Sequence, residues 1–164
     1  MTNSDPMTSP LNHNRTQLPS ADLVLVSCVK TKQKRSAQAK DLYISDFFKK
    51  QRAYAELRGL PWYILSSEYG LVHPEKVIEP YERFLPKEPI SYRRQWGTKV
   101  VEELTRVLGS LDGQVIEVHA NAEYINSIRV GLSSRGAILS NPLEGLRLGE
   151  KSQWYKRILA EASN

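Results

Sequence analysis

The sequence predicts a single three-layer α/β/α domain whose mainly parallel sheet has about four strands, in a Rossmann-like arrangement. Runs such as residues 23–26 (Leu-Val-Leu-Val) and 62–65 (Trp-Tyr-Ile-Leu) are apolar on both faces, as strands covered by two layers are. Amphipathic helical segments alternate with these runs, and that alternation indicates parallel strands joined by helical crossovers. At 164 residues, the chain is long enough for one domain with a full core.

The first half of the domain is predicted to run strand, helix, strand. We expect residues 1–21, which are polar and contain three prolines, to be a disordered leader, and residues 22–164 to form the domain. Residues 22–27 form the first strand, which is central because it has no polar face. Ser45 is a good N-cap for the following helix, Gly59 is its expected C′ residue, and residues 61–65 form the second strand.

The second half begins with an irregular excursion over residues 70–89, where four prolines exclude a long helix. Helical spacing of apolar residues and strand-like runs then alternate to the end of the chain. The expected elements are a helix at 91–108, a strand at 114–119, a helix at 122–132, a short strand at 136–140 and a closing helix at 149–162.

Composition narrows the classes of function. The net charge of +5 is concentrated between residues 30 and 58, a stretch that contains nine basic and three acidic residues. Such a surplus indicates a phosphate-binding surface, although a solvated helix face has the same composition. The single cysteine, Cys28, excludes an internal disulfide and a multi-cysteine zinc site, and the three scattered histidines form no metal-spaced pair. We therefore expect no metal and no cofactor.

The same chain shows no signal-peptide layout and no apolar run of about 20 residues, the length of a membrane span. We therefore expect a cytoplasmic protein without a membrane partner. The sequence leaves the oligomeric state open.

Polar residues stand where the predicted strands end: Ser27, Ser66, His119 and Asn141. The carboxyl ends of parallel strands lie at one edge of a sheet, and ligands of open α/β sheets bind in the crevice at that edge. The sequence therefore predicts a binding crevice there, although these residues assemble no recognised catalytic triad.

Glu68 is the strongest catalytic candidate, because it directly follows a strand and is the only acidic residue between residues 62 and 74. Burial there would suit it as a general acid or base, and the alternative is that it neutralises the basic loop. Asp41 is a second candidate, as a general base or as the ion-pair partner of a lysine. The alternative is that Asp41 is a solvated turn residue. His119 is a third catalytic candidate, as a proton carrier near neutral pH. The alternative is that His119 has a structural role.

The predicted ligand-binding residues share phosphate-binding or base-stacking chemistry. The turn after the first strand offers backbone N–H groups, hydroxyls and lysines to an anion. Its Ser-x-x-Lys spacing is a weaker signal for a serine hydrolase, because a basic loop follows instead of a helix. Tyrosines suit stacking on a base, although buried tyrosines with a bonded hydroxyl are commoner. The full set is Ser27, Lys30, Lys32, Tyr43, Arg52, Ser66, Tyr69, Gly70, Tyr81 and Asn121.

Five motifs stand out together: Ser27-Cys28-x-Lys30-x-Lys32, Asp41-Leu42-Tyr43-x-Ser45, Trp62-Tyr63-Ile64-Leu65-Ser66, Tyr69-Gly70-Leu71 and Pro80-Tyr81. In combination they resemble an uncharacterised bacterial and phage domain family, which is distantly similar to the YaaA peroxide-stress proteins. The resemblance covers about residues 23–155. It implies an α/β domain in a nucleic-acid or genome-maintenance setting, with DNA binding and protection from oxidative damage. One departure is the sequence at 119–121, where the family tends to have a small Ala-Gly pair.

Three interpretations remain open. The first is a nucleic-acid-binding protein that holds DNA or RNA on its basic face, with or without an action on a base in the strand-end crevice. The second is an enzyme acting on a small phosphorylated or nucleotide-like metabolite in the same crevice. The third is a non-catalytic stress-related or phage-encoded module.

Overall fold

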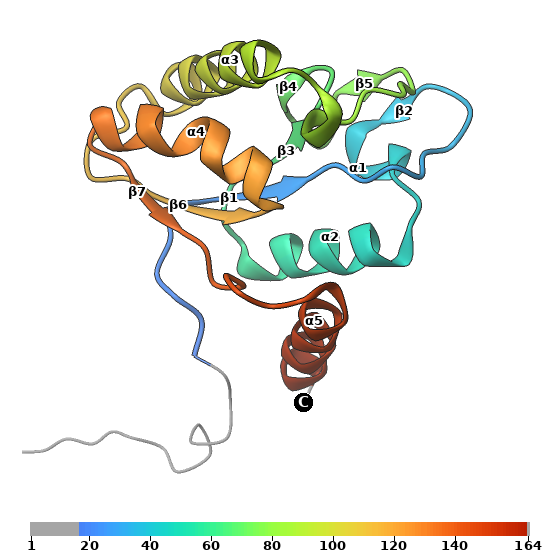
Figure 1. Ribbon diagram of the computed structural model, residues 1–164. Coiled ribbons are helices and arrows are strands. Elements are labelled where there is room, and N and C mark those ends of the chain that lie inside the picture. The colour runs from blue at the N-terminus through green and yellow to red at the C-terminus, as the bar shows by residue number, and fades with distance from the viewer. Residues whose placement is uncertain (1–16, 164) are drawn as a thin grey trace, which may run out of the picture.

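The computed structural model describes residues 17–163 and shows a sheet between two pairs of helices (Figure 1). Helices α3 and α4 cover one face of the sheet, and α2 and α5 lie on the other. Most of the predicted leader lies outside the described residues; within the rest, Leu18 packs against the core and Arg58 donates a hydrogen bond of 2.6 Å to the Pro19 carbonyl. The long helices are α2 (Asp46–Arg58), α3 (Ile90–Leu108), α4 (Ala122–Ser134) and α5 (Leu148–Ser163).

The sheet contains five strands in the order β4-β3-β1-β6-β7. Strand β1 pairs in parallel with β3 and β6, and β6 pairs in parallel with β7. This arrangement confirms the three-layer α/β/α fold and its mainly parallel sheet. The strands are β1 (Leu23–Ser27), β3 (Trp62–Ser66), β4 (Gly70–Val72), β6 (Val115–His119) and β7 (Ile138–Ser140).

The expected irregular excursion at residues 70–89 was wrong in its first part, because the chain turns back at Gly70 and forms β4 antiparallel to β3. Gly70 pairs with Ser66 and has φ of 82°, a left-handed conformation that glycine adopts without strain. Further along, β5 (Val77–Ile78) pairs with β2 (Ala37–Gln38). The other short elements are the helix α1 (Ala39–Leu42) and the 3₁₀ turn η2 (Leu85–Lys87).

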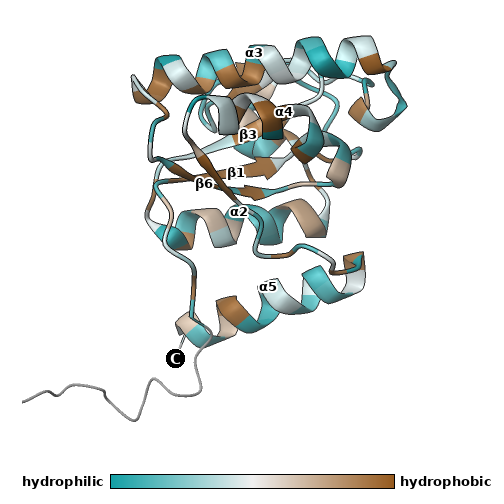
Figure 2. Ribbon diagram, turned by 60° about the vertical axis from the view of Figure 1, so that its left-hand side comes forward, coloured by the Kyte–Doolittle hydropathy of each residue, from teal (hydrophilic) through white to brown (hydrophobic). Residues whose placement is uncertain are grey.

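The core lies on both faces of β1, all five of whose residues are buried. Figure 2 shows the apolar strands β1 and β6 between the two helical layers. Above the sheet, α3 and α4 approach closely at Gly97, where an added Cβ would lie 1.9 Å from the Ser127 carbonyl oxygen. The glycine therefore sets the spacing of that layer.

The strand order reverses between β1 and β6. From β1 the chain passes through α2 to β3 on one side, and β6 then joins β1 on its other side. Because α2 and α4 follow these two strands on opposite faces of the sheet, the carboxyl ends of β1 and β6 are left open to a crevice. Such a switch point is where ligands bind in open α/β sheets.

Within residues 17–163, no helix is long and apolar enough to cross a membrane.

Candidate functional site

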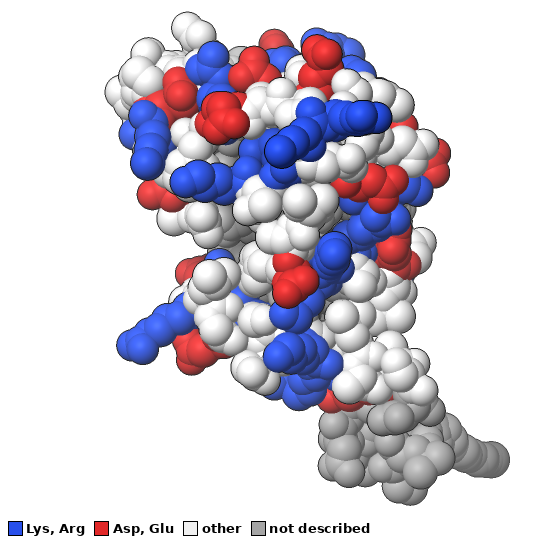
Figure 3. Space-filling model, turned by 90° about the vertical axis from the view of Figure 1, so that its right-hand side faces the viewer, with Lys and Arg blue, Asp and Glu red and all other residues white. Residues whose placement is uncertain are grey.

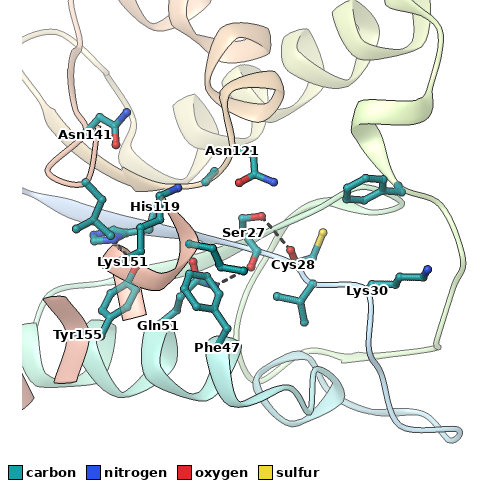
Figure 4. Close-up of a pocket in the computed structure, with 15 residues that line it drawn as sticks. Ser27, Cys28, Lys30, Phe47, Gln51, His119, Asn121, Asn141, Lys151 and Tyr155 are labelled. Carbon is teal, nitrogen blue, oxygen red and sulfur yellow. Dashed lines mark hydrogen bonds between the residues drawn. The ribbon is translucent and has the colours of Figure 1, made fainter. Parts of the chain in front are cut away.

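A crevice of about 250 Å³ lies at the switch point between β1 and β6 (Figure 4). The end of β1, the end of β6, the first two turns of α2 and the first two turns of α5 form its walls. Rings and aliphatic side chains make up much of the lining, and the polar side chains include amides, two hydroxyls and two lysines. The lining residues are Ser27–Lys30, Phe47, Gln51, Phe84, His119–Asn121, Asn141, Leu143, Leu148, Lys151 and Tyr155.

Three of the four predicted strand-end residues line this crevice: Ser27, His119 and Asn141. Gln51 of α2 fixes the end of β1 by donating a hydrogen bond of 3.1 Å to the Ser27 carbonyl. The fourth residue, Ser66, is fully buried and accepts hydrogen bonds from the backbone N–H groups of the turn that leads into β4. The hairpin therefore directs the end of β3 away from the crevice.

A buried polar network lies beneath the crevice and joins α2, β6 and α5. The Glu117 carboxylate is inaccessible to solvent, pairs with Arg58 at 2.6 Å and accepts hydrogen bonds from Tyr54 and from His119 Nε2, the latter at 2.6 Å. His119 Nδ1 lies 2.7 Å from the Tyr155 hydroxyl. In the neutral ring, Nε2 donates to Glu117 and Nδ1 accepts the tyrosine proton. The network holds α5 against the sheet.

Its partners determine the ionisation of the network. Burial alone would raise the pKa of Glu117, but hydrogen bonds from His119 and Tyr54, together with the nearby Arg58 charge, lower it below its ordinary value. Burial raises the pKa of Tyr155, and the adjacent Tyr54 and Glu117 add to that effect. Glu117 is therefore a stable carboxylate, and Tyr155 keeps its proton.

Lys151 is the partly buried cation of the crevice. Its side chain is partly buried on the first turns of α5, and burial lowers its pKa. Within residues 17–163, its ammonium forms no ion pair, although Lys40 and Arg52 elsewhere on the chain do. Lys30 lines the opposite end of the crevice and is exposed to solvent. The crevice therefore presents a partly desolvated positive charge.

Glu68 lies outside this crevice. Its carboxylate accepts a hydrogen bond of 3.0 Å from Arg83, which also binds Glu88, and the side chain is about a third exposed. Tyr69 beside it donates its hydroxyl proton to the Glu79 carbonyl at 3.2 Å. Glu68 and Tyr69 lie partly exposed on a turn, Gly70 is buried in the β4 hairpin, and none of these three predicted site residues lines the crevice.

Two further predicted residues, Lys32 and Tyr81, line a neighbouring groove, and Tyr43 and Ser66 are buried beside Tyr81. The hydroxyls of Tyr43 and Tyr81 are 2.6 Å apart, and Ser66 donates to Tyr81 at 3.0 Å. The Lys32 ammonium lies 4.4 Å from the centroid of the Tyr81 ring, and burial lowers its pKa. Because its phenol is buried and hydrogen-bonded, Tyr43 does not offer a face to a stacked base.

Asp41 and Arg52 neutralise each other at 2.7 Å, and Arg52 also binds Glu56 at 3.2 Å. The structure therefore brings together only part of the predicted set: Ser27, Lys30, His119 and Asn121. It adds residues that the sequence did not single out for the site: Phe47, Gln51, Lys151 and Tyr155. The roles of all of these residues stay predictions.

Ion pairs within the chain neutralise part of the basic stretch at residues 30–58. Three of its nine cations, Lys40, Arg52 and Arg58, pair with carboxylates. On the side of the molecule that lies to the right in Figure 1, Lys and Arg side chains stand among Asp and Glu (Figure 3). A continuous basic face is therefore not formed there.

Among the described residues, no group of three or more His, Cys, Asp or Glu side chains could hold a metal ion.

A family model described as "Family of unknown function (DUF6884)" matches residues 23–157. No curated protein matches the chain. The match confirms the expectation of an uncharacterised domain family.

Proposed function

The chain belongs to the family of unknown function DUF6884, and we propose that it binds a small nucleotide-like anion in the crevice between β1 and β6. The observation that carries this proposal is the Lys151 ammonium, which is partly desolvated and unpaired among the described residues at a topological switch point. Burying a cation without a partner costs free energy, and an anionic ligand would offset that cost.

The walls of the crevice suit a flat heterocycle beside that charge. Phe47 contributes a partly exposed ring, which packs edge to face at 5.8 Å on the buried ring of Tyr155, and Leu143 adds an aliphatic wall. Asn121 and Asn141 supply amide donors and acceptors at the rim. Mostly apolar walls with a few convergent polar groups are typical of small-molecule sites.

A nucleotide unit of this kind occurs free or within a nucleic-acid strand, and one observation favours the strand as a second source. Lys30 lines both the crevice and the neighbouring groove, which also contains Lys32, Lys34 and Tyr81. Cations along such a groove could follow the phosphates of a single strand. The resemblance to YaaA proteins, with their association with DNA, supports the same source.

Replacing Lys151 by glutamine is expected to weaken binding of nucleoside monophosphates about tenfold or more, because a charge-assisted contact is lost. Calorimetric titration with the four ribonucleoside 5′-monophosphates measures the effect. Lys156→Gln is the matched control, since Lys156 is exposed on the same helix and lines no part of the crevice. Equal losses in both variants, or none in either, would refute the role given to Lys151.

The two sources of the nucleotide are separated by titrating single-stranded DNA, double-stranded DNA and RNA at about 50 and about 200 mM salt. A strand bound through several phosphates should lose affinity steeply over this range, whereas a mononucleotide should lose little. Tight, salt-sensitive binding of an oligonucleotide that competes with the mononucleotide would assign the site to nucleic acid. Absence of competition would assign it to the free nucleotide.

A further inference from the structure

A second cavity, of about 330 Å³, adjoins the crevice. One face of α4 and the loop from Asn141 to Leu146 form its walls. It shares residues with the crevice, and Lys151 lies in the lining of both. The shared residues are Ala120, Asn121, Asn141, Leu143 and Lys151, so the two cavities form one continuous depression.

The lining of the second cavity differs from that of the crevice. Ala122, Ile125, Asn126 and Arg129 recur at helical spacing, so one face of α4 looks into it. The apolar rings of the crevice are absent from this lining, and amides and cations take their place. A bound molecule that spans both cavities would therefore meet an apolar compartment at one end and a polar, basic one at the other.

Two cations from different helices reach the second cavity: Arg129 from α4 and Lys151 from α5. Within residues 17–163, neither side chain has an ion-pair partner, in contrast to Arg52 and Arg58. The Asn121 side chain, at the N-terminus of α4, forms no capping hydrogen bond and stays available. Glu144 is the one carboxylate in the described lining, so the cations outnumber it.

We propose that this second cavity is a phosphate subsite, which seats the phosphate of a nucleotide between Arg129 and Lys151 while its base lies in the crevice beside Phe47 and Tyr155. This inference rests on the proposed function and makes its ligand a nucleoside phosphate of defined orientation. A guanidinium binds phosphate oxygens through a planar fork, and an ammonium supplies a compact second charge.

The orientation follows from the positions of the cations. Lys30 lies at the end of the crevice away from Lys151 (Figure 4) and lines no part of the second cavity. A phosphate held at Lys30 would turn the nucleotide end for end. The two orientations therefore depend on different side chains, and substitution separates them.

The test compares nucleoside 5′-monophosphates, the corresponding nucleosides and inorganic phosphate by calorimetry on the full chain. We expect the monophosphate to bind at least about tenfold more tightly than the nucleoside. Arg129→Gln should remove most of that advantage and leave nucleoside affinity unchanged. Arg106→Gln on α3 is the matched control, because Arg106 is exposed and lines neither cavity. Inorganic phosphate should compete with the monophosphate and not with the nucleoside.

Each other outcome overturns the inference in a recognisable way. Equal affinity for nucleoside and monophosphate would remove the phosphate subsite and leave binding in the crevice intact. Loss of the phosphate advantage in Lys30→Gln, but not in Arg129→Gln, would place the phosphate at the opposite end. If neither nucleoside nor monophosphate binds the wild-type chain, the proposed function fails together with the subsite.

Discussion

Replacing Glu117 by glutamine is expected to lower the free energy of unfolding by about 3–5 kcal/mol, the usual cost of breaking one side of a buried ion pair. The substitution keeps the shape of the side chain but leaves Arg58, whose side chain is 8 % exposed, without a counter-charge. It also weakens the acceptor that orients His119, and through His119 the hydroxyl of Tyr155 on α5. Loss of these contacts would also loosen the packing of α5, which forms one wall of the crevice.

Urea unfolding near pH 7, followed by circular dichroism, measures this change. Glu102→Gln is the control, since Glu102 is exposed on α3 and its replacement should change stability by less than about 0.5 kcal/mol. A loss below about 1 kcal/mol in Glu117→Gln would show that Arg58 finds another partner and that the network does not hold α5.

The same carboxylate gives stability a dependence on pH. The pKa of Glu117 is lower in the folded chain than its ordinary value of 4.5, so its contribution is complete above that value and is lost as the pH falls through the lowered pKa. The Glu117→Gln variant has no carboxylate at this position and therefore lacks this pH-dependent contribution to stability. The difference in stability between wild type and variant should therefore shrink below about pH 4.

Gly97→Ala is expected to destabilise the chain by roughly 3 kcal/mol, the upper end of the range for overpacked cores. An added Cβ would lie 1.9 Å from the Ser127 carbonyl oxygen, which belongs to the backbone of α4 and cannot rotate away. The helices α3 and α4 would have to separate, and α4 also forms the wall of the second cavity.

Gly149→Ala provides the matched control for this substitution. Gly149 also lies in a helix, but nothing stands within 4 Å of the position of its added Cβ. Alanine there should be neutral or stabilising by up to about 1 kcal/mol. Thermal unfolding of both variants decides the matter: a similar effect in each would contradict close packing of α3 on α4 at Gly97.

Much of the fold could be predicted because local patterns agree with the final packing. The four parallel strands and four long helices each carry a run or a periodicity of their own, and the caps Ser45 and Gly59 are as expected. Strand β4 could not be recognised, because Gly70–Val72 follows β3 after a short turn and forms only by pairing back on β3. Four prolines nearby also indicated irregular chain.

The candidate site was predictable where strand order alone determined it. Ser27 and His119 end the two strands at the switch point, so their meeting follows from a parallel sheet. Glu68 was favoured by its place just after a strand, but the hairpin at Gly70 turns it to the surface beside Arg83. Lys151 comes from the far end of the chain, and only tertiary packing brings it to the crevice.

An amide NMR titration of the full chain with a nucleoside monophosphate tests most directly whether the ligand occupies the crevice between β1 and β6. Our account predicts that the largest shift changes fall on residues 27–30 and 119–121 and on Lys151. Shift changes centred on residues 68–70, with no change at the crevice residues, would contradict it.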